Sequence, residues 1–408
     1  MQKANLEIAI THIVTRKKQT LVAALGVTIG LSIYLFMNSL TNGFDKFQNA
    51  ETFKSTAHIK IYKDDEQTKP LSKYENSRAL IINSQIVNNS KKIINPLQLI
   101  SIIKKEPYIT DVIMQVDFSA FYNKGTAQVK GTGNGVNIAE YNSMFNTQKY
   151  MKAGSISDLQ NNMNGIILGS GIAEKLGVRV GDNISVSSSF GVGKNLKIVG
   201  IFELGSSMVD NAKSFVNIST AQQFLKESSS YVNTIYANTV DYNNSTEYMN
   251  RLQQLTNYTV EDWKTTNADI MAISSTRNIM FGAISFAILV VAAFGIYNIL
   301  SSTITQKIND IAILKATGYR GSDVIQIFIT EALIMGLIGA AAGLLLGSLL
   351  IFIMQNVYVG GPVGYFPISF EKSLMMESFL IGIFVTLFAG YFPAKKAADV
   401  DPVSIFRK

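Results

Sequence analysis

The side chains that most often carry catalysis or bind metals are scarce in this chain and far apart. It has no cysteine, which excludes disulfides, thiol catalysis and cysteine-based zinc sites. Its two histidines, His12 and His58, fall on opposite sides of the first predicted membrane span. They therefore cannot share a Ser-His-Asp triad or a zinc ion. The acidic run Asp64-Asp65-Glu66 is more typical of a solvated turn than of a cation site.

Three short stretches imitate ligand-binding loops but lack the residues that the chemistry needs. Gly131–Gly135 does not have the G-x-G-x-x-G spacing of a dinucleotide site. Gly191–Asn195 looks like the end of a phosphate loop, but Ser188 stands where the first glycine is required and Asn195 where Ser or Thr is required. Asp241–Asn250 lacks the sixth-position glycine of a calcium loop and reads better as a helix start. We predict no catalytic, cofactor or metal site in this chain.

The composition instead indicates a membrane protein with a large soluble part. Of 408 residues, 47% are apolar and only 16% are charged, below the usual quarter. Four stretches hold almost no charge, whereas the remainder is ordinarily polar. The formal net charge of +7 does not indicate a nucleic-acid partner, because the basic residues flank the apolar stretches.

The predicted fold has four transmembrane α-helices in a 1+3 arrangement, with a large α+β extracytoplasmic domain between spans one and two. Residues 21–40 carry no charge, and 20 residues rising about 1.5 Å each span roughly 30 Å of hydrocarbon. We interpret them as an uncleaved signal anchor. The predicted segments are the cytoplasmic N-terminal segment 1–20, helix 21–40, outer domain 41–277, helix 278–306, cytoplasmic loop 307–330, helix 331–355, outer loop 356–373, helix 374–393 and cytoplasmic tail 394–408.

The distribution of basic residues predicts the orientation. Lysine and arginine are concentrated in segments 1–20, 307–330 and 394–408, whereas the loop 356–373 has only Lys372. Short cytoplasmic loops are enriched in these residues, so both termini are predicted to be cytoplasmic.

Within 41–277 the pattern is α+β. Strands 111–122 and 126–133 are predicted to form a hairpin, as are strands 183–189 and 195–203. A short helix 170–177 ends at a glycine, and another helix is predicted to begin at the cap residue Ser219. The Asn/Ser-rich segment 76–95 reads as an insertion or mobile loop whose role we do not assign.

Glycines at four-residue spacing predict close helix packing. They are expected to bring the spans against a second permease, with packing inside one chain as the alternative. They are Gly26, Gly30, Gly339, Gly343 and Gly347.

Several stretches, in order along most of the chain, resemble the MacB/FtsX-like permeases of bacterial ABC transporters. They are Met37–Gln48, Gly165–Val186, Leu196–Leu225, Asn298–Lys307, Asp310–Gly347 and Phe392–Arg407. The likeness is closest to the lipoprotein-releasing (Lol-type) branch, on the basis of Asn42-Gly43-Phe44, Asp310–Leu314 and Glu203–Phe215. The segments 76–95 and Val357–Phe370 depart from that pattern and leave the cargo open.

The resemblance implies a protein of the bacterial inner membrane that is not itself an enzyme. It would pair with a second permease, identical or paralogous, and with two copies of a separate ABC-type ATPase, which would bind ATP and Mg. ATP-driven motion would reach the outer domain and release a lipoprotein from the membrane to a periplasmic carrier. Two alternatives remain: export of a periplasmic small molecule or peptide by a macrolide-efflux-type system, and mechanical activation of a cell-wall hydrolase by an FtsX-type permease.

Two sets of residues follow from this expectation. In the loop 307–330, apolar and charged residues recur at helical spacing, which predicts a helix. Gly318 could end it as a left-handed cap, and an Asp323/Gln326 box could start the next helix. This helix could lie on the membrane surface. The resemblance favours a helix that couples to the ATPase through Ile308, Asp310, Ile311, Leu314, Lys315, Gly318 and Tyr319. An apolar shelter for acyl chains could be lined by Leu31, Tyr34, Leu35, Met37, Ile284, Ile288 and Val291, unless these side chains simply face lipid or one another.

Overall fold

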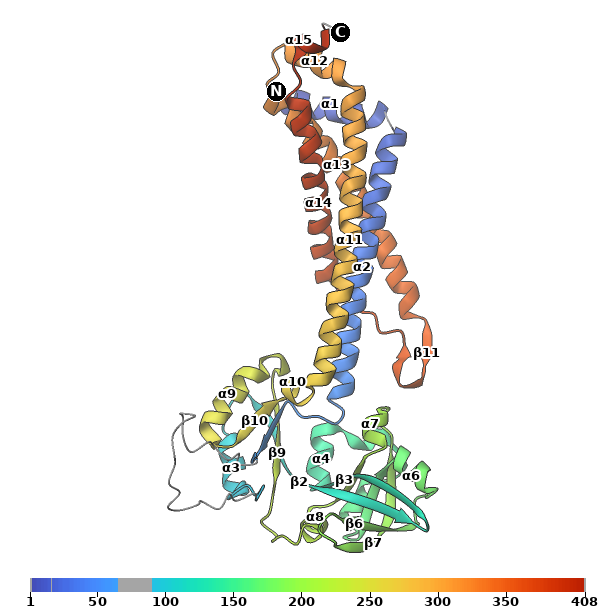
Figure 1. Cartoon of the computed structure of the whole chain (residues 1–408), viewed down its shortest axis with the longest axis vertical. Helices are drawn as coiled ribbons and strands as arrows, with labels where there is room; N and C mark the ends of the chain where they lie inside the picture. The colour runs from blue at the N-terminus through green and yellow to red at the C-terminus, as the bar shows by residue number, and fades with distance from the viewer. Residues whose placement is uncertain (1, 16, 65–89, 407–408) are drawn as a thin grey trace, which may run out of the picture. The chain divides into compact units, whose positions relative to one another are not determined.

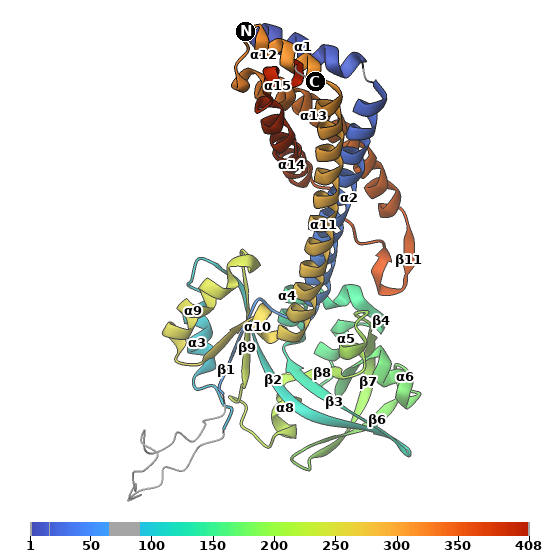
Figure 2. The same ribbon diagram turned by 45° about the horizontal axis from the view of Figure 1, so that its top comes forward.

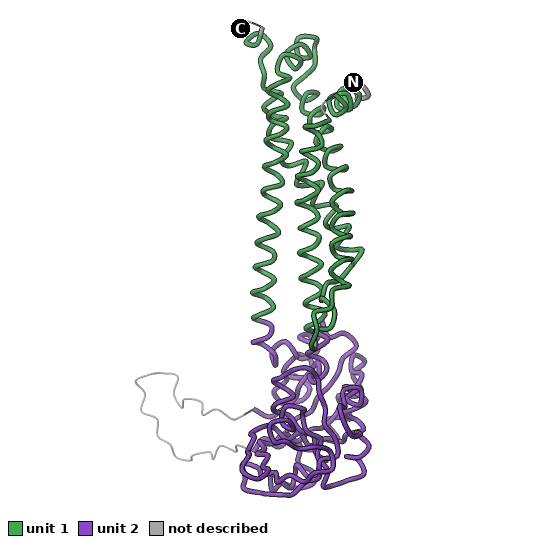
Figure 3. Tube along the Cα trace, turned by 90° about the vertical axis from the view of Figure 1, so that its right-hand side faces the viewer, with its two compact units in different colours: residues 1–48, 272–408 green, residues 49–271 purple. Residues whose placement is uncertain are grey.

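The computed structural model describes residues 2–15, 17–64 and 90–406, so most of the predicted insertion 76–95 lies outside the described residues. The chain forms two compact units (Figure 3). We call residues 1–48 with 272–408 the helical unit, and residues 49–271 the α/β domain.

The helical unit contains four helices long and apolar enough to cross a membrane (Figure 1). They are α2 (Lys17–Thr52), α11 (Ala268–Gln306), α13 (Gly321–Gln355) and α14 (Lys372–Ala398). Each predicted apolar stretch lies inside a longer helix, because polar turns continue the helix beyond the hydrocarbon-length segment. The fold class predicted from the sequence is confirmed.

Shorter elements lie at both ends of this bundle. They are α1 (Gln2–Thr15), α12 (Ile308–Ala316) and α15 (Pro402–Phe406) at one end, and strand β11 (Tyr358–Gly360), 3-10 helix η3 (Gly361–Val363) and strand β12 (Gly364–Tyr365) at the other (Figure 2). The sequence predicts residues 1–20 only as a cytoplasmic segment, and in the structure α1 within it is a helix packed on α13. The amide of Asn5 donates to Gln326 at 3.0 Å, and His12 lies 3.4 Å from the buried carboxylate of Glu331.

The α/β domain is built on one mixed sheet of ten strands. The strands are β1 (Ile59–Tyr62), β2 (Ile109–Lys124), β3 (Ala127–Val136), β4 (Met151–Gly154), β5 (Gly165–Gly169), β6 (Asn183–Ser188), β7 (Gly193–Phe202), β8 (Lys213–Asn217), β9 (Thr234–Thr239) and β10 (Thr259–Asp262). The helices are α3 (Pro96–Ile103), α4 (Ile138–Phe145), α5 (Ile156–Gln160), α6 (Ser170–Leu176), α7 (Ser207–Asp210), α8 (Ile218–Phe224), α9 (Ser245–Thr256) and α10 (Trp263–Thr266), with 3-10 turns η1 (Thr147–Tyr150) and η2 (Tyr242–Asn244).

Six of the strands close a ring. β2 pairs with β3, β3 with β8, β8 with β5, β5 with β7, β7 with β6, and β6 with the second half of β2. Alternate residues of these strands, such as Phe118, Tyr122 and Ile198, form one buried cluster, which α6 and α8 join. This alternation is what a closed sheet filled by side chains requires.

The first half of the long strand β2 belongs to a second lobe. There it pairs with β9, which continues through β1 to β10. Ile59, Ile61 and Ile235 of this sheet pack with Leu99 of α3 and Leu252 of α9. A single strand of 16 residues therefore ties the two lobes together.

The hairpins predicted from alternation are confirmed. β2 and β3 turn at Gly125, whose φ of 59° is left-handed, and β6 and β7 pair antiparallel. The helix predicted at 170–177 ends at Gly177, also left-handed at φ 61°. One detail was wrong: α8 begins at Ile218 with Asn217 in the cap position, two residues before the predicted cap Ser219, because β8 runs directly into the helix.

Candidate functional site

The helix α12 is attached to the helical unit along one side. Ile311 is buried among Val324 and Phe328 of α13 and Ala394 and Ala397 of α14. Burying such a side chain contributes roughly 1.5–3 kcal/mol to the free energy of unfolding. The face of α12 that carries Ile311 therefore belongs to the protein's own interior.

Lys315 strengthens the same attachment. Its ammonium donates to the backbone carbonyls of Ala398 at 2.7 Å and Val400 at 2.6 Å. The last carbonyls of a helix lack partners within the helix, and a cation there also complements the helix dipole. Lys315 thus caps the C-terminal end of α14 and joins it to α12.

The opposite face of α12 is exposed. Asp310 and Asn309 are exposed, and the apolar side chain of Ile313 is 51% exposed. Ile308, Leu314 and Tyr319 are half-buried at the boundary of the two faces, and Gly318 ends the segment with φ 104°. An exposed face that combines an isoleucine with polar groups suits docking to a protein groove.

The residues predicted for coupling are therefore divided between two tasks. Asp310 lies on the exposed face, whereas Ile311 and Lys315 hold the helix in place. Ile313 was not predicted as a coupling residue, although its apolar side chain between Asp310 and Ala316 was the available signal.

The predicted Asp323/Gln326 box is wrong: the Asp323 carboxylate accepts the backbone N–H of Arg320 at 2.9 Å, and Gln326 bonds Asn5 instead.

The glycine row of α13 packs against α2 of the same chain. A Cβ on Gly339 would lie 2.6 Å from Val27 Cβ, one on Gly343 2.9 Å from Thr28 O, and one on Gly347 3.0 Å from Leu35 Cδ2. These contacts correct the expectation that the row faces a second permease, since α2 already occupies it. The small residues allow the two backbones to approach closely.

The two glycines of α2 behave differently from each other. A Cβ on Gly30 would lie 2.7 Å from Ala292 Cβ of α11, so Gly30 is a packing residue. A Cβ on Gly26 would meet no neighbouring element within 4 Å among the described residues. Its predicted role in close helix packing is therefore not met in the described part of the chain.

The residues predicted to shelter acyl chains also fall into two groups. Leu31 and Leu35 are buried in the bundle, where Leu31 packs on Gly382 of α14, so they cannot line an open shelter in this conformation. Tyr34, Met37 and Ile288 are half-buried. Ile284 and Val291 are exposed on α11, Val291 to 71%, and remain available to lipid or cargo.

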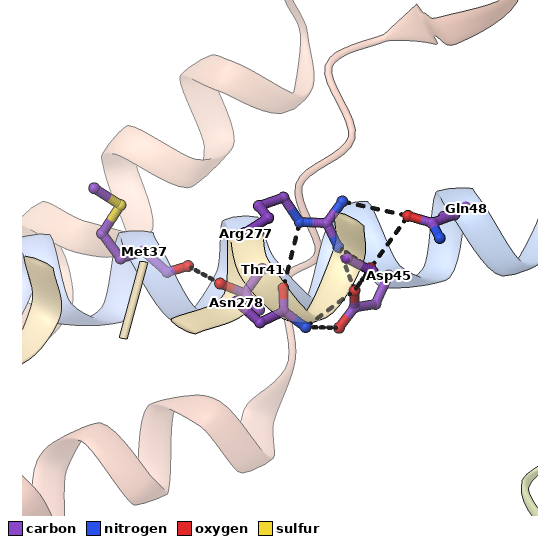
Figure 4. Close-up of polar contacts among 7 residues, drawn as sticks. Met37, Thr41, Asp45, Gln48, Arg277 and Asn278 are labelled. Atoms are coloured by element: carbon purple, nitrogen blue, oxygen red, sulfur yellow. Dashed lines mark hydrogen bonds and ion pairs between the residues drawn. The ribbon is translucent and has the colours of Figure 1, made fainter. Parts of the chain in front are cut away.

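A polar cluster that sequence reasoning missed joins α2 to α11 (Figure 4). The guanidinium of Arg277 forms an ion pair with Asp45 and donates to the Ser274 hydroxyl at 2.6 Å. The amide of Asn278 donates to Asp45 at 3.1 Å, and the Ser274 hydroxyl donates to Gln48 at 3.2 Å. We call these five residues the stalk cluster.

The stalk cluster is partly shielded from water. The side chains of Arg277 and Asp45 are 20% and 36% exposed, and the ring of Phe44 lies 5.2 Å from the guanidinium carbon. The sequence contained one signal for this cluster. Asp45 and Arg277 carry opposite charges just beyond the apolar parts of spans one and two, at the same end of both. The cluster fastens α2 to α11 near the end of the helical unit opposite α12.

Within residues 2–15, 17–64 and 90–406, no group of three or more His, Asp or Glu side chains is placed to hold a metal ion. His58 of the α/β domain accepts the backbone N–H of Thr239 on Nδ1 at 2.9 Å and stacks edge-on against Phe53. Burial lowers the pKa of His58, against opposing contributions from its bond with Thr239 and from the Asp241 carboxylate.

Two family models match the chain and together cover most of it. A MacB-like periplasmic core domain matches residues 20–255, and an FtsX-like permease C-terminal domain matches residues 282–402. Both agree with the 1+3 arrangement of spans around one large domain. The chain is therefore a permease of the ABC-transporter class, and it belongs to the MacB/FtsX family.

Curated relatives share only part of their length with this chain. The pyoverdine export ATP-binding/permease protein PvdT of Pseudomonas aeruginosa is 32% identical over 150 residues, which cover 35% of this chain and 21% of that protein. The macrolide export ATP-binding/permease protein MacB of Escherichia coli K12 is 35% identical over 115 residues, 28% of this chain and 17% of that protein. The match thus spans about a fifth of each relative.

Two solved structures are similar to this chain at low identity. The periplasmic region of MacB from Actinobacillus actinomycetemcomitans covers 55% of this chain and 98% of that structure, with 14% identity and a TM-score of 0.34. The extracellular domain of YknZ from Gram-positive bacteria covers 40% of this chain and 87% of that structure, with 13% identity and a TM-score of 0.30.

Proposed function

We propose that this chain receives ATP-driven motion through α12 and passes it along α11 toward the domain between the first two spans. The observation that carries the proposal is the two-sided α12: Ile311 and Lys315 fix it to the bundle, and Asp310 and Ile313 face outward. A helix held in this way moves with the bundle when its exposed face is pushed. The exposed face would bind a separate ATPase subunit that holds ATP and Mg.

The helix α11 suits the transmission step. It is continuous for 39 residues, about 58 Å at 1.5 Å per residue, and only Lys307 separates its end from the start of α12. The stalk cluster fastens it to α2, so displacement of one helix is shared by the other. Two ATPase copies and a second permease, identical or paralogous, would complete the complex, with both termini cytoplasmic in the bacterial inner membrane.

Substitutions on the exposed face of α12 test the proposal. Ile313→Asp and Asp310→Lys are expected to lower the ATPase activity that co-purifies with the tagged permease by about tenfold or more, since loss of about 1.4 kcal/mol of binding is tenfold. The matched control is Val403→Asp, which places the same charge on the exposed face of α15. Undiminished ATPase recovery with both α12 variants would refute the coupling role.

For the cargo, we propose lipoprotein release to a periplasmic carrier. The support is the likeness of Asn42-Gly43-Phe44, Glu203–Phe215 and Asp310–Leu314 to lipoprotein-releasing permeases, together with the exposed apolar residues Ile284 and Val291 on α11. Drawing an acyl chain out of lipid costs about 0.8 kcal/mol per CH₂, so extraction needs both an energy source and an apolar surface.

Export of a small molecule is the second candidate, and the names of the curated relatives favour it: they are exporters of pyoverdine and of macrolides. Depleting the permease and fractionating the membranes separates the two. Lipoproteins retained in the inner membrane would support lipoprotein release. Normal lipoprotein sorting, with a small molecule accumulating in the cells, would support the exporter.

A further inference from the structure

An apolar groove runs between α11 and α14 on the outside of the helical unit. Its volume is about 510 Å³. This size is within the usual range for sites that take small molecules. Phe286, Phe294 and Tyr297 line it from α11, and Phe384, Phe388 and Phe392 line it from α14.

The aromatic wall on α14 leads to two lysines. Phe384, Phe388 and Phe392 recur at four-residue spacing, which places them on one face of the helix, and each is more than half exposed. The same spacing reaches Lys396 one turn later, beside Lys395, and both lysines are exposed. The lining of the groove is therefore apolar, and two exposed lysines of α14 follow its last phenylalanine within about one helical turn.

We propose that this groove holds an acyl chain of an anionic glycerophospholipid whose phosphate is bound by Lys395 and Lys396. Phe384 and Phe392 are eight residues apart, so the wall is about 12 Å long at 1.5 Å per residue. It thus runs alongside much of one leaflet of a hydrocarbon core roughly 30 Å thick. Tyr297 lines the groove as well, and its phenol is amphipathic like other tyrosines at membrane interfaces.

The charge of the site decides the occupant. A neutral lipid would fill the groove but gain nothing from Lys395 and Lys396. Basic residues near an anionic membrane surface each strengthen binding by about fivefold, so the pair is worth about thirtyfold. A helix of a second permease would use the phenylalanines but would need acidic residues to satisfy the lysines.

Native mass spectrometry of the full chain in detergent tests the proposal. Dioleoylphosphatidylglycerol is expected to bind at least tenfold more tightly than dioleoylphosphatidylcholine, and the double variant Lys395→Gln/Lys396→Gln is expected to lose about thirtyfold of the affinity for phosphatidylglycerol. The matched control Lys17→Gln/Lys18→Gln removes two exposed lysines from α2 and should lose little. Ala293→Trp, which fills the groove, should weaken phosphatidylglycerol binding without changing the charge.

Each contrary result has a definite meaning. Equal affinity for the two lipids shows only unspecific annular lipid and overturns the proposal, as does equal loss in the two double variants. Full binding to Ala293→Trp shows that the lysines act without the groove. If Ala293→Trp does not fold, photoactivatable phosphatidylglycerol is used with the native chain instead. Labelling outside residues 384–392 and 286–297 overturns the proposal. Cross-linking of a second permease to these residues also overturns it.

Discussion

Replacing Lys315 by methionine tests whether this side chain anchors α12 or contacts a partner. Methionine keeps an apolar stem of similar length and removes the two hydrogen bonds to the carbonyls of Ala398 and Val400. A hydrogen bond from a charged group contributes about 1.5–3 kcal/mol, and because Lys315 is half-buried we take the lower part of that range for the pair, about 2 kcal/mol. The melting temperature of the helical unit should then fall by about 4–8 °C.

The single tryptophan makes the assay selective. Trp263 is buried in the α/β domain, so its fluorescence reports that domain, whereas circular dichroism of the whole chain is dominated by the long helices. Lys315→Met should lower the melting temperature measured by circular dichroism and leave the tryptophan transition unchanged. The control Lys18→Met alters an exposed lysine of α2 and should change neither. An unchanged helical transition in Lys315→Met would refute the anchoring role.

Three further predictions follow from packing, charge and protonation. Gly339→Ala should destabilise the bundle by about 1–3 kcal/mol, because the added Cβ meets α2. Gly26→Ala, whose Cβ meets nothing, should be neutral or stabilising by up to about 1 kcal/mol. Equal effects of the two variants in thermal unfolding would contradict the packing. A double-mutant cycle of Arg277→Ala and Asp45→Ala should give a coupling energy of about 1 kcal/mol, and strict additivity would show that the ion pair contributes nothing. Because the pKa of His58 is lowered on folding, the unfolded chain binds more protons as the pH falls below about 6.5, so the tryptophan transition should move to lower temperature there. His58→Gln should remove that dependence, and a pH profile identical to the native one would contradict it.

The long apolar stretches and the glycine-ended turns could be predicted from local sequence alone. A charge-free run of hydrocarbon length specifies a span, and alternation specified both hairpins around Gly125 and in 183–203. Local signals also placed a helix in the loop 307–330. These features depend on neighbours within a few residues, which is why one sequence sufficed.

Contacts between distant segments could not be predicted in the same way. The row of Gly339, Gly343 and Gly347 signals a close partner but not whether that partner is α2 or another chain. Helical spacing showed that Ile311 and Lys315 share a face, yet only the positions of α13 and α14 reveal that this face is internal. The ring of strands closed by β2 and β6 likewise depends on pairing across about 65 residues.

The most direct test of the central claim is hydrogen exchange in residues 272–283 of α11, measured in the ATPase-bound permease in nanodiscs with and without a non-hydrolysable ATP analogue. If α12 and α11 carry the motion, the nucleotide changes exchange in this segment in the native chain, and Ile313→Asp abolishes the change. Identical exchange with and without the nucleotide in the native complex would contradict the account.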